Sequence, residues 1–260
     1  MSKKDKNFYK SGNKKLDEGD YQGALDDYSK AIELDPENPE IYIKRGKIRS
    51  HYGVRDFRGA IDDYLKATEL DPENPKIYIE RGYYKSSSRV RNYQGAIDEY
   101  SKAIELDPEN PEIYIKRGYI KYLYLGDYQG AIDDYSKAIE LDPENPEIYI
   151  KRGDIKTRSS ISDDQGAIDD YSKAIEVDPI NPETYRDRAE LKILLKDDQG
   201  AIDDYSKVIE LDPTNSDIFI DRADVKSRAM DHQGAIDDYS KAIELDPTNS
   251  DIFIDRADVK

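Results

Sequence analysis

Residues 130–143 read GAIDDYSKAIELDP, and the chain repeats this stretch seven times with small changes. The glycine that begins each copy lies at positions 23, 59, 95, 130, 166, 200 and 234, so the period is 34 to 36 residues. A period of this size is typical of stacked helical pairs, each of which is too small to bury its own apolar face. The sequence therefore predicts an all-α fold, an α-solenoid of helix–turn–helix repeats.

The repeated stretch is itself the second helix of each pair. Ala131, Tyr135, Ala138 and Ile139 recur at the spacing of one helical face, and the residues between them are polar. The Asp-Pro pair at its end stops the helix, because the residue before a proline is pushed out of helical geometry. A residue that can cap this helix lies three positions before each glycine. These caps are Asp20, Asp56, Asn92, Asp127, Asp163, Asp197 and Asp231.

A first helix is predicted between one Asp-Pro pair and the next repeated stretch. It begins with an asparagine cap followed by a proline, which suits the first helical turn. These pairs are Asn38-Pro39, Asn74-Pro75, Asn110-Pro111, Asn145-Pro146 and Asn181-Pro182. The last two copies keep the cap, as Asn215 and Asn249, and have serine in place of proline.

The composition is acidic and lacks cysteine. The 260 residues have a formal net charge of -17, so nucleic acid and anionic membranes are not expected as principal partners. Disulfides and thiolate chemistry are excluded, and no cofactor is expected. We find no apolar run long enough for a membrane span and no signal peptide, and a cytoplasmic location is the default expectation.

An aromatic residue recurs early in each first helix, as in Tyr42, and a small residue follows four positions later, as in Gly46. Together with the alanine, tyrosine, alanine and proline of the second helix, this pattern resembles the tetratricopeptide repeat (TPR) proteins over nearly the whole chain. The resemblance implies a right-handed superhelix and a single array over residues 1–260. Its repeats would span residues 5–38, 39–74, 75–110, 111–145, 146–181, 182–215 and 216–249, with 250–260 as a half repeat or capping helix.

One position departs from the family pattern. The residue before the small one is usually leucine in such repeats, whereas here it is arginine in all but the first copy. Because this arginine lies on the apolar stripe of its helix, we expect it to be half-buried and paired, Arg45 with Asp63 for example. The alternative is an arginine whose stem covers apolar surface while its head reaches water.

The first helices also contain most of the variation between copies. In proteins similar to this one, first helices line the concave face of the superhelix and grip an extended peptide or a partner helix. We therefore predict a non-enzymatic scaffold or adaptor that binds a protein partner there. The candidate groove residues are Tyr9, Asn13, Lys44, Lys47, Tyr83, Lys116, Tyr119, Tyr122, Arg186, Asp187, Glu190, Asp221 and Asp224.

Three alternatives stay open from the sequence. The variable charges could be solvated faces without a ligand. The chain could self-associate, with its uncapped last repeat stacking on the lysine-rich first repeat of another copy. The near identity of the copies would also suit an engineered consensus array, although the irregular connections speak against one. Catalysis has little support, because the two histidines, His51 and His232, lie in different copies.

Overall fold

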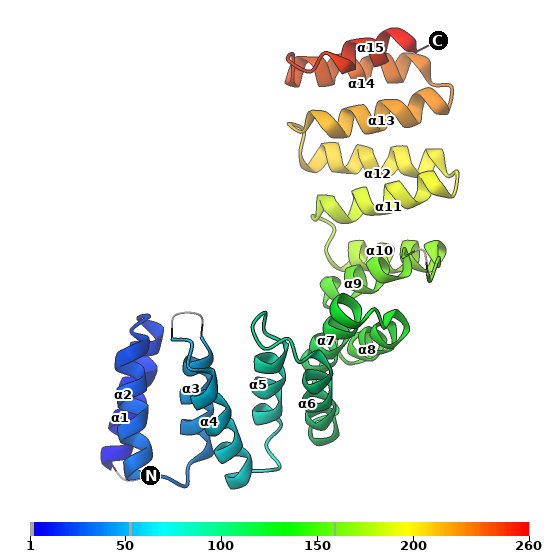
Figure 1. The fold of residues 1–260 in the computed structure, drawn as a ribbon. Coiled ribbons are helices and arrows are strands. Elements are labelled where there is room, and N and C mark those ends of the chain that lie inside the picture. The colour runs from blue at the N-terminus through cyan, green and yellow to red at the C-terminus, as the bar shows by residue number, and fades with distance from the viewer. Residues whose placement is uncertain (1–2, 52–53, 159, 260) are drawn as a thin grey trace. The chain divides into compact units, whose positions relative to one another are not determined.

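The computed structural model describes residues 3–51, 54–158 and 160–259, with side chains from residue 7 onward. Across these residues the chain forms fifteen α-helices and one short π-helical segment, η1 (Figure 1). The helices are α1 Lys3–Asp17, α2 Tyr21–Leu34, α3 Pro39–Ser50, α4 Phe57–Leu70, α5 Pro75–Ser86, α6 Tyr93–Leu106, α7 Pro111–Ile120, η1 Lys121–Leu125, α8 Tyr128–Leu141, α9 Pro146–Lys156, α10 Asp164–Val177, α11 Pro182–Leu194, α12 Asp198–Leu211, α13 Ser216–Arg228, α14 His232–Leu245 and α15 Asp251–Asp258. The all-α fold expected from the repeats is confirmed.

The helices group into two compact units, Met1–Gly130 (unit 1) and Ala131–Lys260 (unit 2). Unit 1 contains the helical hairpins α1–α2, α3–α4 and α5–α6, and unit 2 contains α9–α10, α11–α12 and α13–α14, followed by α15 on α14 (Figure 1). Each first helix also packs on the second helix before it within the same unit, as α3 does on α2 and α13 on α12.

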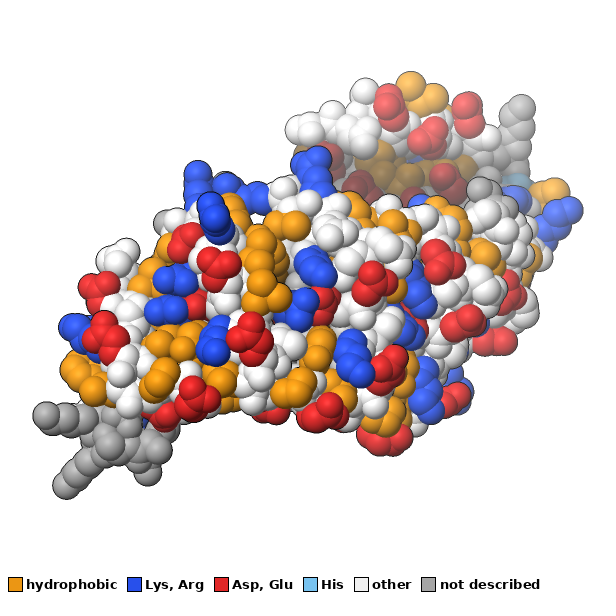
Figure 2. All heavy atoms as spheres, turned by 60° about the horizontal axis from the view of Figure 1, so that its bottom comes forward, with side chains coloured by type: hydrophobic (Ala, Val, Ile, Leu, Met, Phe, Trp, Pro, Cys, Tyr) orange, Lys and Arg blue, Asp and Glu red, His pale blue; other side chains and the backbone are white. Residues whose placement is uncertain are grey.

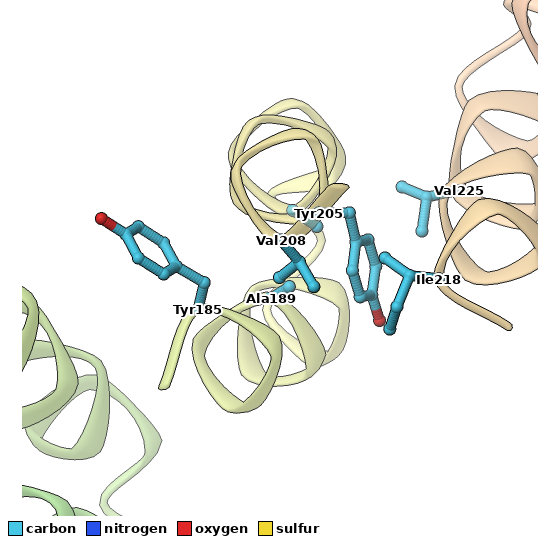
Figure 3. Packing of buried hydrophobic residues seen from close by; sticks show 7 residues of the cluster. Tyr185, Ala189, Tyr205, Val208, Ile218 and Val225 are labelled. Carbon is cyan, nitrogen blue, oxygen red and sulfur yellow. The ribbon is translucent and has the colours of Figure 1, made fainter. Parts of the chain in front are cut away.

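The core of each unit is a series of small clusters between neighbouring helices rather than one central mass. In unit 2, Tyr205 of α12 is 2% exposed and packs with Ile218 and Val225 of α13, while Ala189 of α11 is fully buried (Figure 3). The alanine and tyrosine of the repeated stretch therefore face inward, as their helical spacing predicts.

The predicted caps are formed. Asn38, Asn74, Asn110, Asn145, Asn181 and Asn215 each accept a hydrogen bond from the backbone N–H two residues later. The caps of the second helices accept one from the glycine N–H of the repeated stretch, at 2.9 Å for Asp20 and 3.0 Å for Asp127. These bonds satisfy amides that would otherwise lack a partner at the start of each helix.

A left-handed residue precedes the second helix in every connection. Gly19 and Gly126 take this role at φ 79° and 66°, whereas the other connections use Arg55, Arg91, Ser162, Lys196 and Met230. Compared with the 34-residue copies, the copy that begins at Pro111 has one extra residue, and this residue is accommodated differently from the two extra residues of the longest copies. It follows α7 as the π-helical turn η1, since a π-helical turn accommodates one residue more than an α-helical turn.

The recurring arginine is paired with a carboxylate, and the expected partner is confirmed for Arg45. Its Nε and Nη2 donate to the Asp63 carboxylate, with Nη2 at 2.6 Å from Oδ1. Its Nη1 donates at 3.1 Å to Ser29 Oγ, which belongs to the second helix of the preceding copy. Arg45 therefore links the two helices of its own hairpin and also bonds to the preceding hairpin. We call this arrangement the arginine clasp.

A second cation, four residues after the arginine, completes the clasp. Arg49 Nη1 donates to Asp63 at 2.9 Å in unit 1, and Lys192 Nζ lies 2.8 Å from Asp204 in unit 2. The sequence analysis did not anticipate this second cation. The same set recurs as Arg152 with Asp170 and Lys156, Arg222 with Asp238 and Lys226, and, with glutamate as the carboxylate, Arg81 with Glu99 and Lys85.

The first copy replaces the arginine by Ser11 and keeps the carboxylate. Ser11 Oγ donates to Asp27 at 2.6 Å, and Lys15 Nζ lies 2.7 Å from the same carboxylate. Burial alone would raise the pKa of Asp27, but the hydrogen bonds from Lys15 and Ser11 outweigh it and lower the pKa. The buried carboxylate of each of these clasps thus has at least one cationic partner.

Candidate protein-binding face

The residues that differ most between copies lie on one side of the first helices, beside the tyrosine of the repeated stretch. We number the first helices by alignment with α3, so that Pro39 is position one and residue 5 is position one in α1, and call positions two, six and nine the variable face. Asn13, at position nine of α1, accepts a hydrogen bond from the Tyr28 hydroxyl at 2.7 Å. Asp154 accepts one from Tyr171 at 2.8 Å, and Asp224 accepts one from Tyr239. Position nine therefore lies at the edge of the core in both units.

Position nine differs in chemistry from copy to copy, although the tyrosine of the repeated stretch does not change. In chain order it holds Asn13, Lys47, Tyr83, Tyr119, Asp154, Glu190 and Asp224. A place that is constant in geometry and variable in charge and shape is suited to selecting a partner.

In unit 1 the variable face contains both charges, and they pair with one another. Lys47 Nζ lies 2.7 Å from Glu80 Oε1, and Lys76 Nζ lies 2.8 Å from Glu40 Oε1, so each pair joins two successive first helices. Lys116 pairs with Glu112 one turn earlier, at 3.0 Å. Two of the candidate groove lysines, Lys47 and Lys116, thus already neutralise carboxylates of the same face.

Tyrosines provide the accessible apolar surface of unit 1. Tyr83 is 62% exposed and Tyr119 is 42% exposed. Tyr124 of η1 stacks on Tyr93 of α6, with ring centroids 4.1 Å apart, and meets Tyr119 edge-on at 6.2 Å. The ring of Tyr122 lies 6.0 Å from that of Tyr128. Amphipathic rings of this kind are frequent anchors in protein interfaces.

Tyr9 lies at position five and is more enclosed than the tyrosines later in unit 1. It is half-buried with its ring centroid 6.0 Å from that of Tyr28. Burial is the largest cause that raises its pKa, and Glu40 adds to the rise. Position five is buried in the next copy too, because Ile43 is only 1% exposed. Lys44, at position six of the same helix, is half-buried.

In unit 2 the variable face is acidic. Burial raises the pKa of the Asp187 carboxyl to about 6, and the nearby carboxylates of Asp154 and Glu190 add to the rise. The pKa of Asp221 is raised by burial and then by Asp224 and Glu190. Carboxyls of α9, α11 and α13 therefore lie close enough to repel one another.

Arg186, at position five of α11, accompanies these carboxyls. Arg186 lies 3.2 Å from Glu183 and 3.7 Å from Glu190, both on its own helix. It lowers the pKa of Asp187 and of Asp221, but the net shift of each is still upward. The negative charge around Asp187 and Asp221 is thus greater than Arg186 compensates.

The two units also differ in total charge. Residues 1–130 contain 23 lysines and arginines against 24 aspartates and glutamates, whereas residues 131–260 contain 17 against 33. Nearly all of the net charge of the chain therefore belongs to unit 2. On the side of the molecule drawn in Figure 2, red and blue side chains alternate between orange bands.

The structure brings together several of the residues predicted from sequence. Arg186 and Glu190 pair, Asp221 and Asp224 repel each other, and Tyr9 and Asn13 both adjoin Tyr28. Sequence reasoning missed the acidic partners Glu40, Glu80 and Glu112, as well as Asp154. All four could have been found, because they occupy positions two, six or nine of their helices.

The described residues contain no group of three or more His, Asp or Glu side chains that could hold a metal ion. His51 lies against the Tyr21 ring at 4.3 Å, and His232 begins α14. Among the described helices, none has the length and apolar character needed to cross a membrane.

Comparison with known proteins identifies the repeats. A family model described as TPR repeat matches residues 12–50, 92–123 and 121–158. No curated protein matches the chain. The crystal structure of the MamA protein is 27% identical and has a TM-score of 0.58, covering 69% of this chain and 94% of its own.

Two further solved structures resemble the fold. The C-terminal part of a TPR repeat-containing protein from Cytophaga hutchinsonii has a TM-score of 0.77 at 19% identity, covering 95% of this chain and 98% of its own. YrrB, described as a TPR protein with an unusual peptide-binding site, has a TM-score of 0.60 at 21% identity, covering 75% and 97%.

The family model thus identifies tetratricopeptide repeats within this chain, and the helical hairpins have the fold of the solved TPR structures. Repeats of this kind support a scaffold for protein–protein interaction, and the family is generally non-catalytic.

Proposed function

We propose that this protein is a scaffold that holds polypeptide segments against the variable face of each unit, with tyrosine anchors for apolar side chains on unit 1 and carboxyls for a basic stretch on unit 2. The observation that supports the proposal most is the change of position nine from Lys47 and Tyr83 to Asp154 and Asp224 beside an unchanged tyrosine. A solvated surface without a ligand gives no reason for carboxyls to gather where burial disfavours their charge.

The chemistry of the ligand follows from what each face lacks. Asp187 and Asp221 are half-buried carboxyls whose raised pKa reflects too little positive charge nearby, so lysine or arginine side chains of a ligand would stabilise their ionised form. In unit 1 Lys47 and Lys116 are already paired, and the exposed rings of Tyr83 and Tyr119 are the better anchors, for apolar or aromatic side chains.

Peptide binding tests the proposal. Fluorescence anisotropy would compare a lysine-rich extended peptide with a matched glutamate-rich peptide, using wild-type protein and a variant with Asp187→Asn and Asp221→Asn. We expect the lysine-rich peptide to bind the wild type and the variant to lose about tenfold in affinity, with weaker binding at higher salt. Equal binding of the two peptides would contradict a cationic ligand on unit 2.

The role of unit 1 is tested with a separate tyrosine- and leucine-containing peptide. A variant with Tyr83→Ala and Tyr119→Ala should bind this peptide more weakly than the wild type does and should bind the basic peptide with unchanged affinity. The lysine variant with Lys44→Ala and Lys116→Ala is the matched control, because one of its lysines is half-buried and the other already paired. If the lysine variant lost as much affinity as the tyrosine variant, charge rather than aromatic surface would anchor the ligand.

End-to-end stacking of copies is the second candidate, and the structure gives it less support. The positions that hold the buried Ile41 and Ile48 in α3 hold the exposed Asn7 and Lys14 in α1. A polar outer face on α1 offers little apolar area to another copy. Light scattering at two salt concentrations would test this, since a salt-sensitive polymer is expected only if the ends stack.

A further inference from the structure

The connections within the hairpins of unit 1 form one continuous surface at one end of their helices. The α3–α4 and α5–α6 connections leave their hairpins at the same end (Figure 1). The Arg89 guanidinium of the later connection lies over the Phe57 ring at the start of α4, with Cζ 5.3 Å from the ring centroid. One copy later, the Tyr124 ring of η1 stacks on Tyr93 at the start of α6, at 4.1 Å. We call the surface formed by residues 54–58, 88–93 and 121–125 the connection edge.

The first two connections of this edge are basic. Each contributes two exposed arginines, which are Arg55, Arg58, Arg89 and Arg91. The one aspartate among these residues, Asp56, is engaged elsewhere, because it caps α4 by accepting from the Gly59 N–H at 3.0 Å and lies 3.4 Å from Arg49 Nε.

This positive charge is not a property of the repeat. In the six positions before the glycine of the repeated stretch, residues 53–58 and 89–94 together contain four arginines and one aspartate. The corresponding positions of unit 2 contain two cations and five aspartates, in residues 160–165, 194–199 and 228–233. Nor does the backbone require Arg55 or Arg91 at its left-handed position, since Gly126 serves there in the next connection.

The third connection adds apolar surface to the edge. Leu123, Tyr124 and Leu125 are 49%, 42% and 43% exposed. They belong to η1, which is the one π-helical segment among the described residues. Three consecutive exposed apolar residues are unfavourable on a free surface, and π-helical turns are frequent at functional sites. Arginines and apolar side chains therefore lie on the same edge, joined where Tyr93 stacks on Tyr124.

We propose that the connection edge is a docking site for a short acidic segment of a partner protein, one that also has apolar side chains. Its carboxylates would pair with Arg58 and Arg91, and its apolar side chains would cover Leu123 and Leu125. Arginine suits this role because its planar guanidinium binds a carboxylate through two parallel hydrogen bonds. The site lies outside the variable face and does not depend on the function proposed for that face.

Charge and apolar surface together favour this occupant over a nucleic acid. A chain with a net charge of -17 repels a long polyphosphate backbone over most of its surface, whereas a short acidic segment meets mainly the field of the nearby arginines. A polyphosphate backbone would also leave Leu123 and Leu125 in water, but leucine or phenylalanine side chains of a polypeptide would cover them. Two copies of this edge brought together would place arginines against arginines.

Fluorescence anisotropy with the 260-residue chain tests the proposal. The probe is a fluorescein-labelled peptide with glutamates in one half and leucine and phenylalanine in the other, made in both orders so that either chain direction is tested. We expect one order to bind saturably and one-to-one, and more weakly at higher salt. The same peptide with glutamine in place of glutamate should bind about tenfold more weakly.

Protein variants with matched controls locate the basic half of the site. Arg58→Ala with Arg91→Asn should lower the affinity for the acidic peptide about tenfold. The control, Arg158→Ala with Lys196→Asn, removes two exposed cations from the connections of unit 2 and should bind within about twofold of wild type. Asparagine is used at Arg91 and Lys196 because both residues have left-handed backbone, at φ 50° and 62°.

A second pair of variants locates the apolar half. Leu123→Ser with Leu125→Ser should lower the affinity about fivefold, because the peptide then covers less apolar surface. Leu194→Ser with Leu195→Ser, which changes leucines that are 68% and 45% exposed in unit 2, should leave it unchanged. Circular dichroism checks that every variant stays folded.

The proposal would be overturned if neither peptide order bound, or if the unit 2 controls lost as much affinity as the unit 1 variants. Tighter binding of a single-stranded oligonucleotide of equal charge would overturn it in favour of nucleic acid. Dimers of the chain alone that Arg58→Ala with Arg91→Asn dissociates would overturn it in favour of a second copy. Tyr83→Ala with Tyr119→Ala should bind the acidic peptide as wild type does, which separates this site from the variable face.

Discussion

Units 1 and 2 have the same hairpins, caps and arginine clasps, but they differ in charge. Unit 1 is close to neutral, with lysine–glutamate pairs on its variable face, and unit 2 contains almost all of the net negative charge and gathers carboxyls there. The comparison teaches that the residues repeated in every copy maintain the fold, whereas those that vary between copies give each unit its own surface charge. The predictions below test that division, beginning with the residues that should matter equally in both units.

The arginine clasp should be equally important in the two units. Asp63→Ala in unit 1 and Asp204→Ala in unit 2 would each leave two cations without their carboxylate, so we expect each to lower the free energy of unfolding by about 3 kcal/mol. Urea unfolding followed by circular dichroism measures this loss.

The neighbouring exposed aspartates serve as controls for the clasp. Asp62→Ala and Asp203→Ala should change stability by less than about 0.5 kcal/mol. A clasp variant no worse than its neighbour would mean that the buried carboxylate is not a shared element of the two units.

Dependence of stability on pH should distinguish unit 2. The pKa of Asp187 is raised from 3.8 to about 6, so the folded state holds a proton that the unfolded state releases. The resulting stabilisation is fully present below the ordinary pKa and is lost as the pH rises through about 6. Because the carboxyl is only half-buried, we expect a loss of about 1 kcal/mol.

Urea unfolding at several pH values, with wild type and Asp187→Asn compared, isolates this contribution. The variant should show a smaller fall in stability between the two ends of the range. If wild type and variant changed in parallel, Asp187 would not be the group responsible, and the carboxyl cluster of unit 2 would lose its main support.

Position nine should matter to stability where its side chain accepts the tyrosine hydroxyl, as Asp154 does in unit 2, and little where its side chain is exposed, as Tyr83 is in unit 1. Asp154→Ala removes the acceptor of the Tyr171 hydroxyl and should cost about 1 kcal/mol, whereas Tyr83→Ala removes a ring that is 62% exposed and should cost less than about 0.5 kcal/mol. Thermal unfolding compares the two. The Tyr171→Phe variant should make Asp154→Ala nearly neutral, and an unchanged cost would rule out the hydrogen bond as its cause.

Surface ion pairs should have the smallest effect. Lys47→Ala in unit 1 and Lys151→Ala in unit 2 each break an exposed pair, with Glu80 and Glu147, and should cost about 0.3 kcal/mol at low salt and less at high salt. A loss above about 1 kcal/mol for Lys47→Ala would show that pairs between successive first helices act as structural links.

Much of the fold could be predicted because its signals are local. The asparagine and aspartate caps, the prolines and the helical spacing of Ala131 and Tyr135 act within a few residues, so each helix could be bounded from the sequence. The partner of Arg45 was also predictable, since both residues lie on inward stripes of paired helices. The second cation of the clasp was not, because it depends on how two helices cross.

The candidate face was only partly predictable for the same reason. Helical numbering places Tyr83, Lys47 and Asp224 on one side of their helices, but it does not show that Lys47 meets a glutamate of the next first helix. The π-helical turn that sets Tyr124 against Tyr93 was also out of reach, because a one-residue insertion can form either a loop or a bulge.

The sequence by itself determined the repeat, the helices and their order, because caps, prolines and apolar spacing act over one or two turns. Only the tertiary structure decided which charges neutralise one another and which carboxyls of unit 2 are crowded together. Those properties depend on distances between residues 14 to 36 positions apart in the chain, and packing sets such distances.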